Sequence, residues 1–195
     1  PDWSPPPGGV SSATELVALI RSVETRRCAR HASAALRAAV NPLTIAVAAF
    51  PSGNPAAGTS PAQEVERLLL KQAAGANFAI TQLFWDPEVY ISFVDDAKRA
   101  GVTIPILAGL LVPTDIERLS RTAELTGIDP PQALSQTLRD AEGAEAAVQA
   151  GILATARVAR AVLGSGAPGL HLYTYNKARP SLGLLARIGL FDPAA

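Results

Sequence analysis

The stretch Gly75–Asp86, GANFAITQLFWD, decides the fold, because a loop glycine, a short apolar strand and a helix start follow one another within it. Side chains alternate between the two faces of a strand. Both faces of residues 78–85 are apolar, which is typical of a parallel strand covered on both sides. A polar side chain, Gln82, lies near the carboxyl end of this strand. Ligands of α/β sheets and barrels bind at that end, so Gln82 is the first candidate functional residue.

Strands and helices alternate on both sides of this stretch. Apolar runs predict three further strands, at residues 43–50, 104–111 and 170–175. Cap residues, three of them in capping boxes, predict helices that begin after Ser12, Ser60, Asp86, Thr114 and Asp129. Two more helices are expected at residues 143–163 and 181–188.

The first of these helices is expected to turn an apolar side inward. That side is formed by Leu16, Leu19, Ile20 and Val23. Residues 24–41, rich in arginine and alanine, are expected to form a second helix or an extension of the first. Cys28 and His31 lie there, three residues apart, but a metal site needs more ligands than this pair offers.

Alternation of strands and helices predicts an α/β fold with parallel strands and right-handed crossovers. Four βα units are half of the eight in a TIM (β/α)8 barrel, which typically takes about 250 residues. We therefore expect residues 1–195 to form a single, incomplete TIM-barrel domain, with an irregular Pro/Gly-rich start at 1–11. A half barrel leaves two open strand edges and an uncovered interior.

Composition excludes several classes of protein. Of the 195 residues 48% are hydrophobic and 17% charged, and the net charge is zero, so neither nucleic acid nor an anionic membrane is an expected partner. A single cysteine, Cys28, excludes an internal disulfide and fits a reducing compartment. No apolar run reaches the roughly 20 residues of a membrane span, and no signal peptide is recognisable.

The start of the chain has two interpretations. The chain contains no methionine and begins with PDWSPPPGG, which suits neither a helix nor a central strand. A processed N-terminus would explain this, and so would a chain that is the later part of a longer protein. The half barrel favours the second, with the first four βα units expected upstream.

Common cofactor and catalytic motifs are missing from the sequence. No GxGxxG follows a strand, and Walker A, HExxH and GxSxG do not occur. The residues alone therefore leave the reaction open.

Four blocks of sequence resemble the bacterial methylenetetrahydrofolate reductase family, in the family's order and at nearly its spacing. GANFAITQLFWD is similar to the family's GAN-x-x-ITQ-x-F-x-D segment, and VAAFP at 47–51 to its VAAYP strand end. AGLLVPTDIERL at 108–119 and HLYTYNKA at 171–178 resemble later family segments. The resemblance covers about residues 12–190.

The resemblance implies a cytoplasmic TIM-barrel flavoprotein of one-carbon metabolism. Its family binds FAD, reduces it with NAD(P)H and passes the hydride to 5,10-methylenetetrahydrofolate, giving the 5-methyltetrahydrofolate used for methionine. A folate substrate is thus the implied partner, and a homo-oligomer is left open.

The resemblance also implies site residues. Gln82 matches the family glutamine that contacts both the nicotinamide and the folate, and an amide offers a donor and an acceptor together. The FAD contacts are carried over to Ala13, Ala48, Phe50, Asn54, Glu64, Arg67 and Lys71. The folate contacts, besides Gln82, are carried over to Arg118, Tyr173 and Lys177.

Several of these positions depart from the family pattern. Phe50 lacks a phenolic oxygen, Asn54 replaces a histidine, and Leu70 replaces a basic residue. Arg118 stands where a glutamine is usual, and Lys177 lacks the bidentate fork of arginine. The changes together indicate a divergent member.

The family's general acid and its flavin-tuning aspartate match no residue here, so no catalytic residue is assigned. Both belong to segments expected upstream of Pro1. Asp2 is a weak substitute, because the alignment puts it on the wrong side of the strand end.

Plainer interpretations remain for the same residues. Gln82 could be a hydrogen-bonded core amide, and Glu64 and Lys71 a solvated helix face. His171 is more simply a structural, partly buried imidazole, and Trp85 a packing residue under the helix layer. The chain itself could be a flavin-dependent reductase, a non-catalytic half barrel that needs its N-terminal half, or another TIM-barrel enzyme; the last lacks support because NKARPS at 176–181 contains no phosphate-binding glycine turn.

Overall fold

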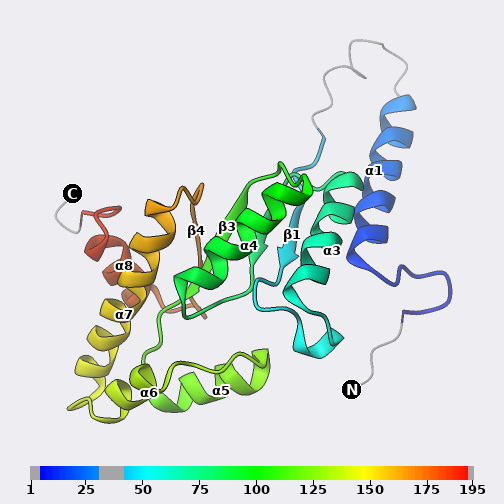
Figure 1. The fold of residues 1–195 in the computed structure, drawn as a ribbon. Coiled ribbons are helices and arrows are strands. Elements are labelled where there is room, and N and C mark those ends of the chain that lie inside the picture. Colours follow the sequence, from blue (N-terminus) through cyan, green and yellow to red (C-terminus); the bar gives the residue numbers. More distant parts are fainter. Residues whose placement is uncertain (1–4, 31–41, 193–195) are drawn as a thin grey trace.

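A four-stranded parallel sheet is the centre of the fold in the computed structural model, which describes residues 5–30 and 42–192 (Figure 1). Asp2 and His31 lie outside the described residues. In the described part the strands follow chain order: β1 (Ala46–Ala49), β2 (Phe78–Thr81), β3 (Ile106–Leu111) and β4 (Leu170–Tyr173). The expected α/β fold with a parallel sheet is confirmed.

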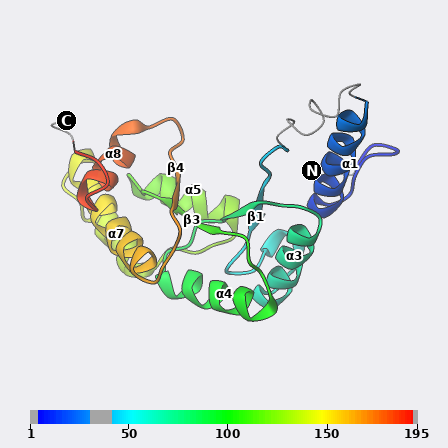
Figure 2. The same ribbon diagram turned by 90° about the horizontal axis from the view of Figure 1, so that it is seen from above.

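Helices connect the strands: α3, α4 and α7 lie along the outer side of the sheet (Figure 2), whereas α5 and α6 lie beyond the carboxyl ends of the strands (Figure 1). α1 (Ala13–Ala29) precedes β1, α3 (Pro61–Ala73) follows it, and α4 (Pro87–Ala100) joins β2 to β3. α5 (Ile116–Thr126), α6 (Gln132–Arg139) and α7 (Ala144–Gly164) join β3 to β4, and α8 (Ala178–Arg187) follows β4. A short 3-10 helix, Pro55–Ala57, lies in the loop after β1.

The two faces of the sheet are covered differently. Val47, Ala49, Ala79 and Thr81 are buried on the side that faces the helices. Their neighbours on the inner face are exposed in β1 and half-buried in β2, where the burial alternates residue by residue. The inner face is therefore less covered than the helix-facing side, which differs from the covering on both sides that the apolar pattern indicated and agrees with the uncovered interior expected of a half barrel.

Strands are shorter than the apolar runs that predicted them. The first strand, expected at 43–50, is limited to Ala46–Ala49, and the opening stretch pairs only over Phe78–Thr81. Gln82 thus lies directly after β2, although its N–H still bonds to Ala49 O at 2.7 Å. The last strand ends at Tyr173 because Tyr175 and Asn176 adopt positive φ values of 46° and 60°.

Helix caps follow the expected chemistry with two corrections. Ser60 forms a complete capping box with Gln63, and Asp86 caps α4 through Glu88 N. The cap of α5 is Asp115 rather than Thr114, because the Asp115 carboxylate accepts from Arg118 N at 2.8 Å. α6 begins after Pro131 without a side-chain cap, so Asp129 does not cap it.

The apolar side predicted for α1 is largely exposed. Leu16, Leu19 and Val23 keep 46%, 45% and 39% of their surface, and Val17 is the buried residue of the helix. The pattern identified the helix correctly, but the helix meets the rest of the chain along an adjacent side. Hydrophobic burial therefore contributes little to holding α1 in place.

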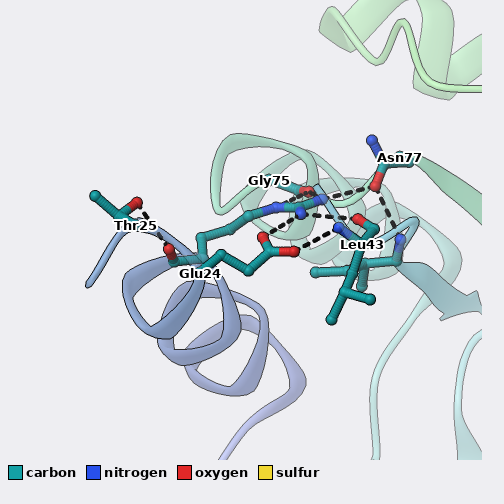
Figure 3. Close-up of polar contacts among 7 residues, drawn as sticks. Glu24, Thr25, Leu43, Gly75 and Asn77 are labelled. Atoms are coloured by element: carbon teal, nitrogen blue, oxygen red, sulfur yellow. Dashed lines mark hydrogen bonds and ion pairs between the residues drawn. The ribbon is translucent and has the colours of Figure 1, made fainter. Parts of the chain in front are cut away.

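Arg21 fastens α1 to the amino-terminal end of the sheet by hydrogen bonds to Leu43, Gly75 and Asn77, which are labelled in Figure 3. Its Nε and Nη2 donate to Gly75 O at 3.0 and 2.7 Å, and Nη2 also donates to Asn77 Oδ1 at 2.6 Å. Its Nη1 donates to Leu43 O at 2.8 Å and pairs with Glu24 Oε2 at 2.7 Å. One guanidinium thus satisfies the backbone before β1 and before β2.

α7 supplies much of the helix layer over the sheet. It is long and apolar enough to span a membrane by length and composition alone, a criterion that core helices of soluble proteins also meet. Its buried face includes Ile152, Ala156, Ala159 and Val162, which belong to the main core. Burial of this face accounts for part of the apolar composition of the helix.

Tyr90 lies at the centre of the core between α4 and β3. It is 1% exposed, stacks on Phe84 with ring centroids 5.6 Å apart, and donates to Ile106 O at 2.7 Å. Burial raises the pKa of its phenol to about 12. The ring therefore resists ionisation well above its ordinary range.

Replacing Arg21 by lysine should loosen α1, because an ammonium cannot reproduce the forked contacts to Gly75, Asn77 and Leu43. We expect the free energy of unfolding to fall by about 2 kcal/mol in urea titrations followed by circular dichroism. Amide exchange should accelerate in α1 more than in β3. The matched variant Arg27→Lys, at an exposed position of the same helix, should change neither, and an Arg21→Lys protein as stable as the parent would contradict the clamp.

Replacing Tyr90 by phenylalanine should change the pH profile of stability. Between pH 10 and 12 the unfolded chain loses the Tyr90 proton while the folded chain keeps it, so stability falls as pH rises through this window. Tyr90→Phe removes this contribution and should flatten the decline, after a loss of about 1 kcal/mol at pH 8 from the missing hydrogen bond. Urea titrations of both proteins at pH 8, 10 and 11 test this. Stability that falls equally with pH in the parent and in Tyr90→Phe would contradict the role of the Tyr90 phenol.

Candidate functional site

Parallel strands bring the candidate residues to one end of the sheet, where the carboxyl ends of the strands meet. They form two groups on either side of Gln82 in the strand order. The first group belongs to β1, the loop after it and α3, with Ala13 added from α1. The second group belongs to α5, the end of β4 and the β4–α8 connection.

Lys71 is the central cation of the first group. It is 5% exposed, and its Nζ donates to Ala48 O at 2.7 Å and lies 6.0 Å from the Phe50 ring centroid. Because Ala49 O pairs with β2, Ala48 O points to the opposite side of β1, which pairs with no strand in the described part of the chain. Burial lowers the pKa of Lys71, and Glu64 partly opposes this.

Glu64 lies two turns before Lys71 on the same helix and is 1% exposed. Its Oε1 accepts from Thr59 Oγ1 at 2.5 Å and pairs with Arg67 Nε at 3.5 Å. Its Oε2 is covered and has no partner within the described residues. A buried carboxylate oxygen without a donor is costly, so it suits a ligand hydroxyl or N–H. Neither Glu64 nor Lys71 is the solvated helix face of the plainer interpretation.

The other first-group residues differ in how they face the site. Ala48 is exposed on the inner face of β1, and Phe50 is half-buried just beyond it. Asn54 uses its backbone to pair with Thr59 at 3.0 and 3.1 Å, which closes the loop around the 3-10 helix. Ala13 is exposed at the start of α1, in a different element from the rest.

Gln82 is half-buried directly after β2. Its Oε1 accepts from Leu83 N at 2.9 Å, which orients the side chain. Its amide nitrogen has no partner in the part of the chain that the structure describes, so it remains able to donate to a ligand. The local bond to Leu83 N agrees with the interpretation as a hydrogen-bonded core amide, while the amide nitrogen leaves the ligand role as a prediction.

The second group lines a pocket of about 370 Å³. Arg118 lies on α5, and Tyr173 and Lys177 come from β4 and the connection to α8. Leu111, Val112, Pro113, Leu119 and Leu125 provide apolar walls. The structure thus brings Arg118, Tyr173 and Lys177 together, as the sequence resemblance implied.

Arg121 adds a third cation to this pocket and was not predicted. It lies three residues after Arg118, which places it on the same face of α5. That spacing was the signal in the sequence. Arg118, Arg121 and Lys177 bring positive charge to the pocket, and no aspartate or glutamate lines it among the described residues. Two of these charges are already paired outside the lining, Arg118 with Asp115 at 3.4 Å and Arg121 with Glu124 at 2.9 Å. The pocket therefore suits an elongated, partly apolar ligand with negative charge.

A close approach across β3 sets the position of Tyr173. Tyr173 Oη donates to Thr81 O at 2.8 Å, two strands away, and Gly109 N donates to Thr81 Oγ1 at 2.8 Å. A Cβ on Gly109 would lie 2.1 Å from Thr81 O and 3.0 Å from the Tyr173 ring. Burial raises the pKa of the Tyr173 phenol, with a smaller effect from Tyr175.

The contacts of His171 and Trp85 agree with purely structural roles for these two residues. His171 is partly buried on the same strand and meets the Tyr173 ring edge to face at 4.9 Å, as a structural imidazole would. Trp85 is partly buried against the cluster of Leu119, Leu138 and Ala147. The described residues contain no group of three or more side chains that could hold a metal ion.

Comparisons with known proteins give a consistent family. The profile of methylenetetrahydrofolate reductase matches residues 1–189. The chain is 34% identical over 155 residues to a probable methylenetetrahydrofolate reductase (NADPH) of Caenorhabditis elegans, covering 77% of this chain and 23% of that protein. It is 30% identical over 147 residues to the 5,10-methylenetetrahydrofolate reductase of Escherichia coli K12, covering 75% and 49%. The chain thus spans at most about half the length of these relatives.

A solved structure shares the fold. It is an uncharacterized protein from Clostridium thermocellum, described as binding two copies of 5-methyl-5,6,7,8-tetrahydrofolic acid. The TM-score is 0.52 at 19% sequence identity, over 80% of this chain and 56% of that one. At this identity the likeness concerns the fold alone.

Replacing Gly109 by alanine should disrupt the Thr81–Tyr173 contact, because the added methyl would lie 2.1 Å from Thr81 O. We expect a loss of about 2–3 kcal/mol in the free energy of unfolding, measured by urea titration. Gly164→Ala is the matched control, since that glycine ends α7 in open space and should tolerate alanine without loss. Equal stability of the two variants would show that β3 can yield to a side chain at 109.

Proposed function

The chain belongs to the methylenetetrahydrofolate reductase family, and from that premise we propose that it serves the FAD-dependent reduction of 5,10-methylenetetrahydrofolate to 5-methyltetrahydrofolate by NAD(P)H. The observation that carries the proposal is the cationic pocket in which Arg118, Tyr173 and Lys177 meet at the strand ends. The relatives' names include both NADH and NADPH enzymes, so the donor is left as NAD(P)H.

The second-group pocket is the proposed folate site. A folate carries a flat heterocycle at one end and glutamate carboxylates at the other, which matches apolar walls with Arg118, Arg121 and Lys177 at the rim. Lys177 offers a point charge to a carboxylate, while Arg118 would share its guanidinium between the ligand and Asp115, which its Nε contacts at 3.4 Å. The Clostridium thermocellum protein of similar fold binds a methylated tetrahydrofolate, which is consistent with this assignment.

Gln82 is proposed to orient both substrates in turn. Its amide nitrogen is available while its oxygen is held by Leu83 N. A donor in this position can bond to the carboxamide of a nicotinamide or to the edge of a pterin. Binding both at one place supports a reaction in which NAD(P)H leaves before the folate enters.

The first group fits the FAD that the family implies. Glu64 Oε2 is a covered acceptor without a partner among the described residues, and a ribose or ribityl hydroxyl would satisfy it. Lys71 offers positive charge beside Phe50 and Ala48, and Arg67, Asn54 and Ala13 complete the residues proposed to hold the cofactor. When bound, the flavin supplies the hydride-carrying group; the residues described here bind and orient it.

A second candidate is a half barrel that is inactive without its N-terminal half. We propose the fold as the last four βα units of a TIM barrel. β1 and β4 each pair on one side only within the described residues, and Leu16, Leu19 and Val23 of α1 are exposed. The family's general acid and flavin-tuning aspartate also match no residue of this chain. In this case folate would still bind, but hydride transfer would need the missing half.

Folate binding and catalysis can be tested separately. Calorimetric titration with 5-methyltetrahydrofolate should show binding that falls about tenfold in Lys177→Gln and in Arg118→Gln, a loss of about 1.4 kcal/mol each. Arg179→Gln is the matched control, because Arg179 pairs with Glu145 at 2.8 Å and does not line the pocket. Equal affinities in all four proteins would contradict the folate assignment.

Flavin and hydride transfer need a second experiment. The purified chain is mixed with FAD, its visible spectrum is recorded, and NADH oxidation with a quinone acceptor is followed. A stoichiometric flavin band with turnover supports a reductase. Folate binding without flavin or turnover supports the half barrel. Sequencing the DNA upstream of Pro1 then tests whether an open reading frame there encodes the Arg-Gly-Asp turn in which the family carries its flavin-tuning aspartate.

A further inference from the structure

Two walls of the proposed folate pocket rest on the same turn of α7. Residues 111–114, at the end of β3, form one wall, and Pro180 and Ser181 of α8 belong to the other. Pairing of β3 with β4 ends at Leu111, so the residues after it are held by other contacts. Residues 151–155 of α7 provide these contacts, and none of them lines the pocket itself.

Gly151 lets α7 approach the first wall closely. A Cβ at this position would collide with Pro113 O and would lie 2.9 Å from Pro113 C. Gly151 lies inside the helix, where a glycine is less favourable than an alanine by about 1 kcal/mol. The contact between α7 and Pro113 gives this unfavourable residue a physical reason.

Thr155 contacts the same wall one turn later. Its hydroxyl lies 3.2 Å from Leu111 O and 2.9 Å from Gly151 O, and its single proton is shared between these acceptors. A bond to the carbonyl four residues earlier is common for a helical threonine, and Thr137 donates to Ala133 O at 2.8 Å in this way. The contact with Leu111 O, outside its own helix, is what distinguishes Thr155.

Ile152 supports the second wall. A Cβ on Gly183 of α8 would lie 2.7 Å from Ile152 Cδ1, and the two helices lie side by side in both views (Figure 1 and Figure 2). Ile152 is buried in the main core, together with Ala156 and Ala159 on the same side of α7. Because the core behind α7 holds this turn in place, a change at residue 151 or 155 is passed to the pocket walls.

We propose that Gly151 and Thr155 are positioning residues for folate. They hold the backbone of residues 111–113 where the pocket accepts the ligand, without touching the ligand themselves. A wall that is held in advance does not have to be ordered when the ligand binds, which favours affinity. This inference rests on the proposed folate site and adds to it residues of a helix that forms no part of the lining.

Calorimetric titration of the full chain with 5-methyltetrahydrofolate tests the role of Thr155. Thr155→Val keeps the shape of the side chain but removes the hydroxyl, and should weaken binding about fivefold. Thr155→Ser keeps the hydroxyl and should bind as the parent does. Thr137→Val is the matched control, because it removes only a bond within a helix, and should leave the affinity unchanged. Parental affinity in Thr155→Val, or equal weakening in Thr155→Ser, overturns the role of this hydroxyl.

Gly151→Ala tests the close approach. The added methyl must push Pro113 away from α7, so the affinity should fall about tenfold or more. Gly164→Ala, in open space at the end of the same helix, should bind as the parent does. All variants are titrated where circular dichroism shows them folded, so that lost affinity reports on the pocket; if Gly151→Ala does not fold, the Thr155 variants decide. Parental affinity in folded Gly151→Ala contradicts the proposal.

Hydrogen exchange of the ligand-free protein separates this inference from the folate assignment. The amides of Val112 and Thr114 should exchange faster in Thr155→Val than in the parent, while those of β1 should not change. If the parent binds no folate, the proposed function fails, and these two amides alone decide whether α7 holds the wall. Unchanged exchange at both amides overturns the positioning role.

Discussion

The hydrogen bonds of Thr81 to the two strands beyond it hold the carboxyl end of the sheet in shape. Backbone pairing between β2 and β3 extends over Ala79 and Ile80. Beyond these residues, the Thr81 hydroxyl accepts a hydrogen bond from Gly109 N, and the Thr81 carbonyl accepts one from the Tyr173 phenol. Gly109 allows both hydrogen bonds, because a side chain at this position would collide with the Thr81 carbonyl and the Tyr173 ring. The position of Gln82, and one wall of the folate pocket, depend on this network.

The opposite end of the sheet is held by side chains that bond to backbone. Arg21 satisfies Gly75 O and Leu43 O, and Gln72 bonds to Thr103 N, Ile104 N and Gly101 O at 2.7, 3.0 and 3.2 Å. Each helix thereby fixes the loop before a strand. Stabilising contacts at the amino ends and ligand groups at the carboxyl ends are thus separated, as in other folds built from parallel βα units.

Local sequence patterns predicted the order of helices and strands. Which helix faces are covered and which polar side chains are buried depend on contacts between residues far apart in the sequence. The caps Ser60 and Asp86 and the apolar runs were readable because neighbours along the chain determine them. The apolar side of α1 was not, since periodicity marks a face without showing what covers it. Arg21 contacts residues up to 56 positions away, and nothing near it in the sequence signals this. Arg121 could have been predicted as a pocket residue from the sequence, because it lies three residues after Arg118. The burial of Glu64 and Lys71 could be recognised only in the packed structure.

Lys71 also has a consequence for how the protein behaves at high concentration. A strand edge with free carbonyl groups is a template onto which a strand of another molecule can add. On β1 the carbonyl of Ala48 lies on that edge and is occupied by the Lys71 ammonium at 2.7 Å. An incoming strand would have to displace a buried positive charge before it could pair there. This single hydrogen bond therefore acts against edge-to-edge aggregation at the unpaired edge of β1 in the described part of the chain.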